Sequence, residues 1–277
     1  MKKMILKTAL PLGLALATQY SVQGQHGHLN TGAVGKSQDA PLYFANAGDF
    51  IATSGYVKTL IHTNSGRFAG YYQGNITLTV LPATAAHAGP DPAAPALGAY
   101  IQASIVAVNG PVGGSFAFWE SGSTAPTHSL ESGQTGTNLW RLSESDGSSG
   151  TDPYGHIHGR RFTATKPGLY TVGFQVFDTS TNGTRNGPIH SPSEVFWITF
   201  QAGVHLELIR PQSTQTRVRF ALPVGESWRL EAADRVTPGA EWLPVGGTLL
   251  GDDYFHEVPE EQPAGQRRFF RLKATGQ

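Results

Sequence analysis

The chain has 277 residues, no cysteine, 14% charged residues and a formal net charge of zero. This length allows one large or two smaller domains with a substantial core, so stability need not come from disulfides. A neutral chain offers no electrostatic basis for binding nucleic acid or an anionic membrane surface. The 34 glycines, 18 prolines and 10% aromatic residues favour short strands joined by tight turns, and therefore an all-β fold.

Residues 1–24 have the organisation of a secretory signal peptide. Lysines open the segment, and the apolar run 9–18 is too short to span a bilayer as a stable helix. Val22 and Gly24 place short side chains before a cleavage site, so we expect the mature chain to begin near Gln25. An uncleaved anchor is the alternative. The prediction is an exported protein, periplasmic, extracellular or at the cell surface, with no membrane span after cleavage.

Alternating apolar and polar residues predict a first domain over residues 25–203, with a β-sandwich or jelly-roll-like arrangement. The clearest strand covers 169–177, where one face carries Tyr170, Val172, Phe174 and Val176. The other expected strands cover 29–34, 41–44, 50–60, 70–81, 99–108, 115–120 and 194–202. Residues 82–95, 121–151 and 180–192 lack alternation and are expected to be loops.

A pair of histidines stands near the start of segment 152–178, which we predict to be a β-hairpin. Alternate side chains of a strand share a face, so His156 and His158 should project together while Ile157 points away. Two imidazoles on one face can bind a single metal ion, since Zn–N bonds are ~2.0–2.1 Å long. An isolated pair is more often two ordinary surface residues, because a metal site needs at least one further ligand.

A second pair, His26 and His28, follows the expected cleavage site. The apolar and glycine-rich continuation 29–34 indicates that this pair leads into a strand and not into a disordered terminus. Cleavage directly before His26 would free an amine for a copper brace, the site of an oxidative polysaccharide-cleaving enzyme, but Gln25 precedes it at the expected site. We expect His28, His26 or His190 to complete a site with the first pair.

The residue types limit the metal and its surroundings. Sites made of imidazole suit Zn(II) or Cu(II), while the lack of cysteine and the presence of only two methionines argue against Cu(I). Asp152 and Asp178 are the candidate acceptors that would orient the imidazole rings from outside the coordination sphere. No residue is assigned a catalytic role.

Gly203 marks a change in composition, since charged residues become more frequent after it and glycine and threonine become rarer. Short strands are expected over 205–209, 217–222, 227–231, 241–245 and 268–273. They predict a small β-sandwich module over residues 204–277, whose core is expected to contain Trp228, Trp242, Phe269 and Leu272.

The run from the second histidine pair into the following strand carries the most specific motif. It contains His156-Ile157-His158, then Phe162-Thr163, then Lys166-Pro167-Gly168-Leu169-Tyr170. With weaker matches at 28–32, 110–118 and 200–203, the stretch ~26–203 resembles the surface-anchored, or choice-of-anchor M, domains of bacterial exported proteins. Members are often encoded near metal-uptake ABC transporters, so the resemblance implies metal binding at the cell surface, with cell-envelope or transport components as partners. Asn30 stands where the family carries an aspartate.

Three classes of function are compatible with these features. The first is a binding protein for Zn or Cu, which the sequence favours. The second is a structural or adhesive exported protein without a metal, in which Tyr56, Tyr71 and Trp119 would be contact residues. The third is a copper or zinc enzyme, for which Glu120 and Glu194 flank strands as candidate bases. The sequence contains no nucleophile elbow, phosphate loop or H-E-x-x-H motif, so an enzyme is the least favoured.

Overall fold

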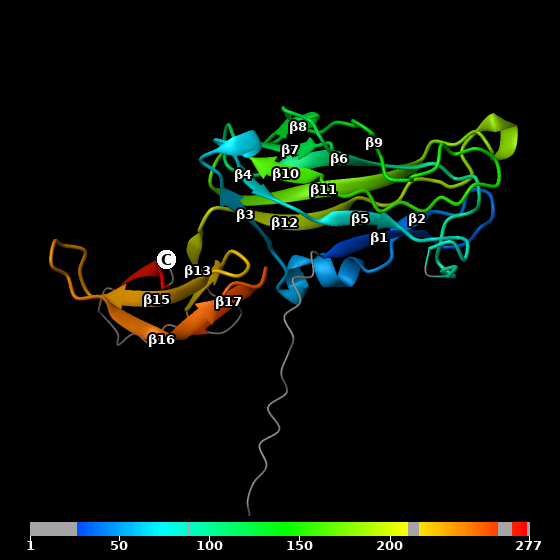
Figure 1. Cartoon of the computed structure of the whole chain (residues 1–277). Coiled ribbons are helices and arrows are strands. Elements are labelled where there is room, and N and C mark those ends of the chain that lie inside the picture. The colour runs from blue at the N-terminus through cyan, green and yellow to red at the C-terminus, as the bar shows by residue number, and fades with distance from the viewer. Residues whose placement is uncertain (1–26, 88, 210–215, 260–267, 276–277) are drawn as a thin grey trace, which may run out of the picture.

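The computed structural model describes residues 27–87, 89–209, 216–259 and 268–275. Within these ranges the fold is all-β and sandwich-like, as predicted, with the strands joined by loops and single 3-10 turns (Figure 1). The 3-10 turns are η1 (Ala47–Phe50), η2 (Ala52–Ser54), η3 (Gly66–Phe68) and η4 (Thr184–Asn186). None of the helical segments described is long and apolar enough to cross a membrane.

The larger module is built on a nine-stranded sheet in the order β8-β7-β10-β4-β3-β12-β11-β6-β9. Neighbours are antiparallel except β3 and β12, which are parallel. The strands are β3 (Lys58–His62), β4 (Tyr72–Gly74), β6 (Ile101–Asn109), β7 (Ser115–Trp119), β8 (His128–Glu131), β9 (Trp140–Arg141), β10 (Arg161–Ala164), β11 (Gly168–Asp178) and β12 (Phe196–Ala202).

This sheet curls so that its two ends approach each other. The segment that follows β8 forms backbone hydrogen bonds with β6, at the far end of the strand order. The Gly133 amide donates to the Val108 carbonyl at 2.7 Å, and the Gly136 amide donates to Val106 at 3.0 Å. The curl encloses a single aromatic-rich core.

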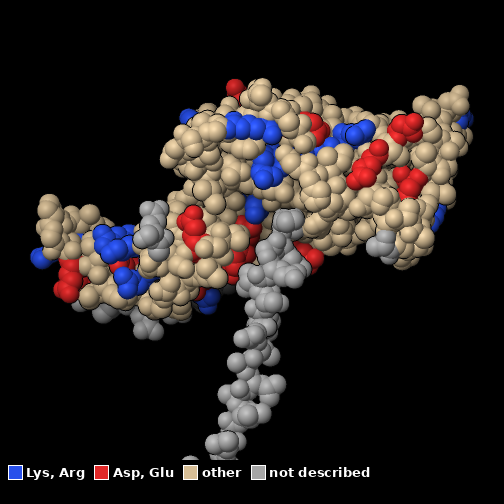
Figure 2. Space-filling view, viewed as in Figure 1, with Lys and Arg blue, Asp and Glu red and all other residues tan. Residues whose placement is uncertain are grey.

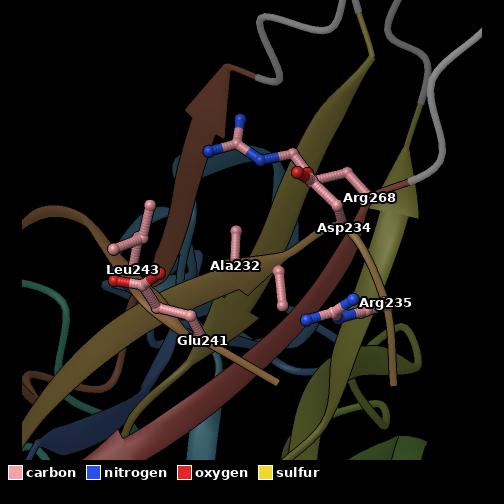
Figure 3. A pocket seen from close by; sticks show the side chains of 7 residues that line it. Ala232, Asp234, Arg235, Glu241, Leu243 and Arg268 are labelled. Carbon is pink, nitrogen blue, oxygen red and sulfur yellow. The ribbon is translucent and has the colours of Figure 1, made fainter. Parts of the chain in front are cut away.

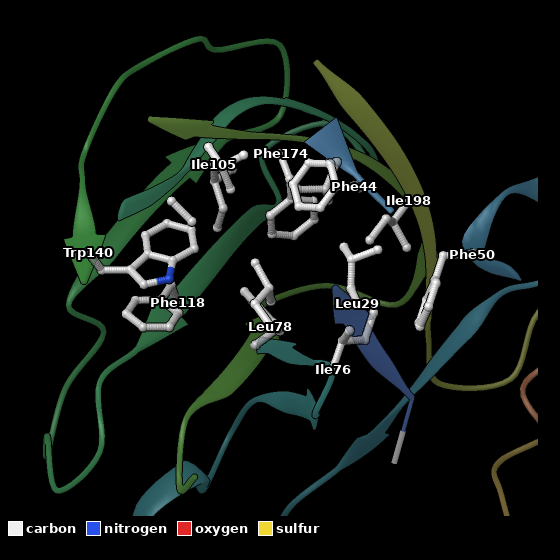
Figure 4. Close-up of a cluster of buried hydrophobic side chains, with 14 of the residues drawn as sticks. Leu29, Phe44, Phe50, Ile76, Leu78, Ile105, Phe118, Trp140, Phe174 and Ile198 are labelled. Carbon is white, nitrogen blue, oxygen red and sulfur yellow. The ribbon is translucent and has the colours of Figure 1, made fainter. Parts of the chain in front are cut away.

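A three-stranded sheet in the order β2-β1-β5 closes the open side of the curled sheet. It consists of β1 (His28–Ala33), β2 (Leu42–Phe44) and β5 (Thr77–Val80), and β1 and β5 are parallel. Figure 4 shows its apolar residues, among them Leu29 and Leu78, facing Phe118, Phe174 and Ile198 of the larger sheet. The two sheets therefore share one buried core.

Several predicted strands have the expected core face but a different partner. The face of β11 is confirmed, since Tyr170, Val172, Phe174 and Val176 are all at most 1% exposed. The expected hairpin of 152–178 is wrong, because β10 pairs with β4 and β7 while β11 pairs with β6 and β12. The turn between β10 and β11 brings the two strands close in sequence, but it does not determine which strands they pair with.

Other boundaries also differ from the prediction. The stretch 70–81 is two strands, β4 in the larger sheet and β5 in the smaller one, because the chain crosses between the sheets at Ile76. The stretch 50–60 contains two 3-10 turns before β3 begins. The expected loop 121–151 contributes β8 and β9.

The chain from residue 206 onward forms two further sheets with a separate core. The sheets have the orders β13-β14-β17 and β16-β15-β18. Their strands are β13 (Leu206–Ile209), β14 (Arg217–Ala221), β15 (Ser227–Ala233), β16 (Leu243–Leu250), β17 (Phe255–Pro259) and β18 (Phe269–Ala274). Their fully buried side chains include Val218, Phe220, Leu222 and Leu230.

The expected core of this smaller module is correct in part. Trp228 and Leu272 pack against the buried cluster. Phe269 is 38% exposed and lies on the outer face, and Trp242 lies beneath the guanidinium of Arg271 at 4.3 Å from its ring centroid. The alternation of side chains along β18 explains this result. Leu272 and Phe269 stand an odd number of residues apart and therefore face opposite sides of the strand.

The two modules contact each other through a short antiparallel bridge. The Val57 amide donates to the Asp253 carbonyl, and the Phe255 amide donates to Gly55, both at 2.9 Å. The Asp253 carboxylate also accepts hydrogen bonds from Lys58 Nζ and from the amide and hydroxyl of Thr59. The smaller module is thus fixed to the start of β3 and is not held by its linker alone.

Candidate metal site

Three of the five predicted histidine ligands lie together at one edge of the larger module. The rings of His28 and His156 are stacked, with centroids 4.6 Å apart and planes 16° apart. The rings of His156 and His158 meet edge to face, with centroids 4.4 Å apart. His28 and His156 are half-buried and His158 is exposed. The cluster is therefore compact and open to solvent on one side.

Strand pairing between distant parts of the chain brings these residues together. β1 runs parallel to β5, which places His28 opposite Thr77. On the other side of β5, the Val80 amide donates to the Gly155 carbonyl at 2.9 Å. This bridge places His156 beside Thr79, so β5 lies between the two histidines.

The hydroxyl of Thr79 joins the first two rings. Its Oγ1 lies 3.3 Å from Nδ1 of His28 and 3.2 Å from Nδ1 of His156. A hydroxyl carries one proton, so it can donate to one Nδ1 and must accept from the other if both hydrogen bonds form. A ring that donates through Nδ1–H keeps Nε2 as a lone-pair donor, the arrangement typical of metal-binding histidines. The other ring accepts at Nδ1 and therefore carries its proton on Nε2, so Thr79 can take the orienting role expected of an aspartate for only one of the two rings.

The histidine pair 156 and 158 projects as predicted, although the segment is not a strand. The residue between them, Ile157, lines a small internal cavity together with Phe118, Trp140 and Phe162. The half-buried Ile157 side chain faces this apolar cavity, so the imidazoles on either side of it point away from the cavity. The predicted alternation therefore holds locally without the predicted hairpin.

Two further contacts fix the backbone of this segment. The His156 amide donates to Oε1 of Glu144 at 2.9 Å. At the other end, Arg160 is 8% exposed and donates through Nε to Oε1 of Glu120 at 2.8 Å, and through Nη2 to the Arg141 carbonyl. The Arg160 guanidinium also lies over the Phe118 ring, 5.7 Å from its centroid. The histidine loop is thus tied down on both sides.

The ion pair beneath the loop predicts a pH dependence. Burial alone would raise the pKa of Glu120, but the hydrogen bond from Arg160 and the Ser121 amide outweigh it, and the pKa of Glu120 lies below its ordinary value. A lowered folded-state pKa means that the stabilisation is present above the unfolded-state pKa and is lost as the pH falls through the folded-state value. We expect Glu120→Gln to lower the free energy of unfolding at pH 7 by up to ~1 kcal/mol, since the carboxylate is partly exposed.

Urea unfolding at pH 7 and pH 3 would measure this effect. The difference between the variant and the wild type should be smaller at pH 3 than at pH 7, because the stabilisation is lost as Glu120 becomes protonated in the folded state. Glu131, an exposed carboxylate in β8, supplies the control variant Glu131→Gln, which should show little pH-dependent difference. A difference that is constant across the two pH values would contradict the role given to the Arg160 ion pair.

His190 was predicted as a ligand, and this is wrong. Its ring is 1% exposed and both nitrogens are used, because Nε2 accepts from the Ala96 amide at 2.9 Å and Nδ1 donates to the Ala40 carbonyl at 3.0 Å. These bonds satisfy two loop backbone groups. Such a ring stabilises the fold and offers no lone pair to a metal.

The two aspartates also have structural roles and do not orient histidine rings. Asp152 accepts hydrogen bonds from the amides of Ala83, Thr84 and Tyr154 and from the Thr84 hydroxyl. Asp178 is 6% exposed and accepts from four amides, those of Tyr100, Ser180, Ile189 and His190. Each carboxylate accepts hydrogen bonds from several loop amides and so holds these loops together, a role that needs no metal.

The remaining predicted ligand, His26, lies outside the described residues. Across residues 27–87, 89–209, 216–259 and 268–275, no three His, Asp or Glu side chains are already arranged as a ready metal site. Thr79 and Glu144 are the contributors that sequence reasoning missed. A threonine inside an alternating strand and a glutamate in a polar loop carry no pattern that would have identified them.

The neighbourhood of the cluster contains one more aromatic contact. The His87 ring stacks on the Tyr154 ring, with centroids 3.8 Å apart and planes 13° apart. Tyr154 precedes the Gly155 bridge, two residues before His156. The exposed His87 ring thus has a tyrosine ring as its stacking partner.

The fold and the histidine cluster together describe the class of this protein. This is an all-β protein with two separate hydrophobic cores and a solvent-facing group of histidines on the larger module. The chain matches no protein-family model, no curated protein and no solved structure.

Proposed function

We propose that this protein is exported and binds a divalent transition metal, Zn(II) or Cu(II), through the histidine cluster. The observation that carries the proposal is the convergence of His28, His156 and His158 from two distant parts of the chain, with Thr79 between two of the rings. The His156 ring contacts each of the other two rings, and imidazole is the ligand type that these two metals prefer.

Export is part of the proposal and is supported by the sequence of residues 1–24. A basic start, a short apolar run and small residues near position 24 are typical of a cleaved signal peptide. Removal of this segment would leave His28 close to the mature N-terminus, and His26 precedes it by two residues in the sequence. The resemblance to exported bacterial domains encoded near metal transporters supports a role in metal acquisition.

Metal binding requires the imidazole rings to turn. The stacked rings of His28 and His156 both direct Nδ1 toward the Thr79 hydroxyl, and His158 is exposed. Rotation about side-chain torsions is low in cost for exposed rings compared with the free energy of structural metal binding, on the order of 10 kcal/mol or more. The tied-down backbone keeps all three rings within reach during this change.

A titration tests the proposal directly. The chain lacking residues 1–24, without an affinity tag and stripped of metal, is titrated with Cu(II) and with Zn(II) by calorimetry. We expect one equivalent of metal to bind, and we expect His156→Ala to weaken binding about 100-fold or more, since it removes a central ligand. His28→Ala and His158→Ala should weaken binding to a similar extent.

Control variants distinguish metal binding at the cluster from non-specific metal binding by exposed histidines elsewhere. His62, which is exposed at the end of β3, supplies His62→Ala, which should bind as the wild type does. The variant His26→Ala measures the contribution of His26 to the metal affinity. No binding tighter than about micromolar, ~8 kcal/mol, would overturn the proposal, and so would equal loss in the His62 control. Protons compete for imidazole nitrogens, so binding should also fall at acid pH.

The alternative is a structural or adhesive exported protein without a metal. Two of the three rings expected to make its contacts are buried, because Tyr56 is 7% exposed and Trp119 is 1% exposed. Tyr71 packs its ring against Trp119 at 5.4 Å. These rings serve the core, so this alternative would need other contact residues.

A further inference from the structure

One outer face of the smaller module carries more cations than acidic groups. On β15, Trp228 and Leu230 face the core, so Arg229 and Glu231 face outward. The register of β18 places Arg271 opposite Glu231 and Lys273 opposite Arg229. Four charged side chains from two adjacent strands thus stand side by side on the β16-β15-β18 sheet.

Three of these four side chains are cations gathered around a single carboxylate. Glu231, with its side chain 4% exposed, lies 2.7 Å from Nη2 of Arg271, 3.5 Å from Nη2 of Arg229 and 3.9 Å from Nζ of Lys273. Nε and Nη2 of Arg271 both donate to the same oxygen, Oε2. The group therefore has a formal surplus of two positive charges.

The surplus charge is open to solvent. The side chains of Arg229, Arg271 and Lys273 are 36%, 43% and 54% exposed. The Nη1 group of Arg271 and the ammonium of Lys273 have donors beyond those that Glu231 accepts. Donors of this kind, fixed at one end by a buried carboxylate, are held ready for a second anion.

The other sheet of the same module shows what a balanced face looks like. On β13-β14-β17, Arg219 pairs with Glu207 at 2.6 Å and Arg217 pairs with Glu257 at 3.0 Å. Each cation there has its own carboxylate. The carboxylate of Glu231 carries one negative charge and three cations surround it, so this group has two cations more than charge balance requires.

Aromatic rings accompany the cations. The Arg271 guanidinium lies over the Trp242 ring, 4.3 Å from its centroid. Phe269 precedes Arg271 by two positions on the same strand face and is 38% exposed. An exposed ring beside cations, as Phe269 provides, offers apolar contact to the face of a sugar ring, while the cations attract its acidic groups.

A pocket at one end of this sheet does not share the surplus. It has a volume of about 300 Å³ and lies between the ends of β15, β16 and β18 (Figure 3). Its charged lining consists of two acids and two bases, Asp234, Glu241, Arg235 and Arg268. Figure 2 shows Lys and Arg intermingled with Asp and Glu over the visible face of the smaller module. An anion is therefore directed to the sheet face and not into the pocket.

We propose that the outer face of the β16-β15-β18 sheet binds an acidic polysaccharide through its carboxylate groups. The backbone positions of these cations, on adjacent strands and at alternate positions, stand roughly 5 to 7 Å apart. Their side chains lie on an open sheet face and not in a pocket, which suits a polymer with repeated charge. Three cations on a neutral chain are few for nucleic acid, whose affinity depends on many phosphate contacts. This proposal is independent of the metal site.

Binding of a defined acidic glycan tests it. The chain lacking residues 1–24 is titrated at 50 mM salt with a galacturonic acid hexasaccharide and, separately, with a neutral glucose hexasaccharide. We expect only the acidic probe to bind. The double variant Arg229→Gln/Lys273→Gln should weaken binding by about fivefold for each cation removed, and raised salt should weaken binding of the wild type.

The design keeps Arg271 intact, because it holds the buried Glu231 and its loss could unfold the module. The matched control is Arg217→Gln/Arg219→Gln on the balanced sheet, which should leave the affinity unchanged. Equal loss in this control, equal binding of the neutral glycan, or no binding of the acidic probe at low salt would overturn the proposal. Equal binding of a single-stranded DNA of the same charge would overturn the assignment to a glycan.

Discussion

Replacing Gly155 with alanine should destabilise the larger module and displace the histidine cluster. A Cβ atom at this position would lie 1.7 Å from the Leu142 carbonyl oxygen and 2.6 Å from its carbonyl carbon. Both are backbone atoms and cannot rotate away. We expect the free energy of unfolding to fall by about 3 kcal/mol or more, since overpacking against backbone is among the costliest substitutions.

The surrounding hydrogen bonds explain why the chain cannot relax at low cost. The Leu142 amide donates to the Ile101 carbonyl at 2.9 Å, and the Ser143 hydroxyl donates to the Pro153 carbonyl at 2.8 Å. Moving either segment would break these contacts and the bridge from Gly155 to Val80. His156 would then lose its place beside Thr79, and metal affinity should fall together with stability.

Urea unfolding and metal titration of Gly155→Ala measure both effects. Gly48 supplies the matched control, because a Cβ atom there would meet nothing within 4 Å. Gly48→Ala should remain within ~0.5 kcal/mol of the wild type. A stable Gly155→Ala variant with unchanged metal affinity would show that the close approach of these two segments is not required for the site.

Replacing Asp253 with alanine should uncouple the two modules. Its carboxylate accepts from Lys58 Nζ at 2.5 Å, from the Thr59 amide at 2.8 Å and from the Thr59 hydroxyl at 2.6 Å. The side chains of Lys58 and Asp253 are 14% and 13% exposed, so removing one leaves the other nearly buried and unpaired. This costs ~3–5 kcal/mol when a pair is fully buried, and we expect the lower part of that range here.

The backbone adds to this effect. Asp253 has a φ of 60°, in the left-handed region that alanine disfavours by roughly 1–2 kcal/mol and that Asp and Asn tolerate better. Asp253→Asn therefore keeps the backbone and removes the charge, which separates the two contributions. The alanine variant should unfold in two separate transitions or become sensitive to protease at the bridge near Gly55 and Phe255.

The neighbouring residue provides the control for this experiment. Asp252 has a side chain that is 54% exposed and lies 3.3 Å from His256, with no bond to the larger module. Asp252→Ala should change stability by less than ~0.5 kcal/mol. If Asp253→Ala unfolded as the wild type does, the bridge would not contribute to coupling and the two cores would be held together by other contacts.

The two proposed sites lie on different modules, and the bridge relates them. The histidine cluster belongs to β1, β5 and the segment before β10, while the cationic face belongs to β15 and β18. A docked module would hold a metal site at a fixed position relative to a bound surface polymer. The Asp253 variants can test this relation, because they should alter the coupling without changing either site.

The sequence determined those features that depend on short-range alternation. The strand over 168–178 was predictable with its buried face because Tyr170, Val172, Phe174 and Val176 repeat with the period of a strand. The outward projection of His156 and His158 was predictable for the same reason, since a single apolar residue, Ile157, stands between them. The all-β class followed from composition.

Only the tertiary structure decided which histidines meet. His28 and His156 are brought together by the pairing of β1 with β5 and of Val80 with Gly155, and the energy of such contacts depends on partners far apart in the chain. His190 shows the opposite result, because burial between Ala40 and Ala96 commits both of its nitrogens to backbone groups. Local pattern fixes the face on which a side chain points, and non-local packing fixes what it meets there.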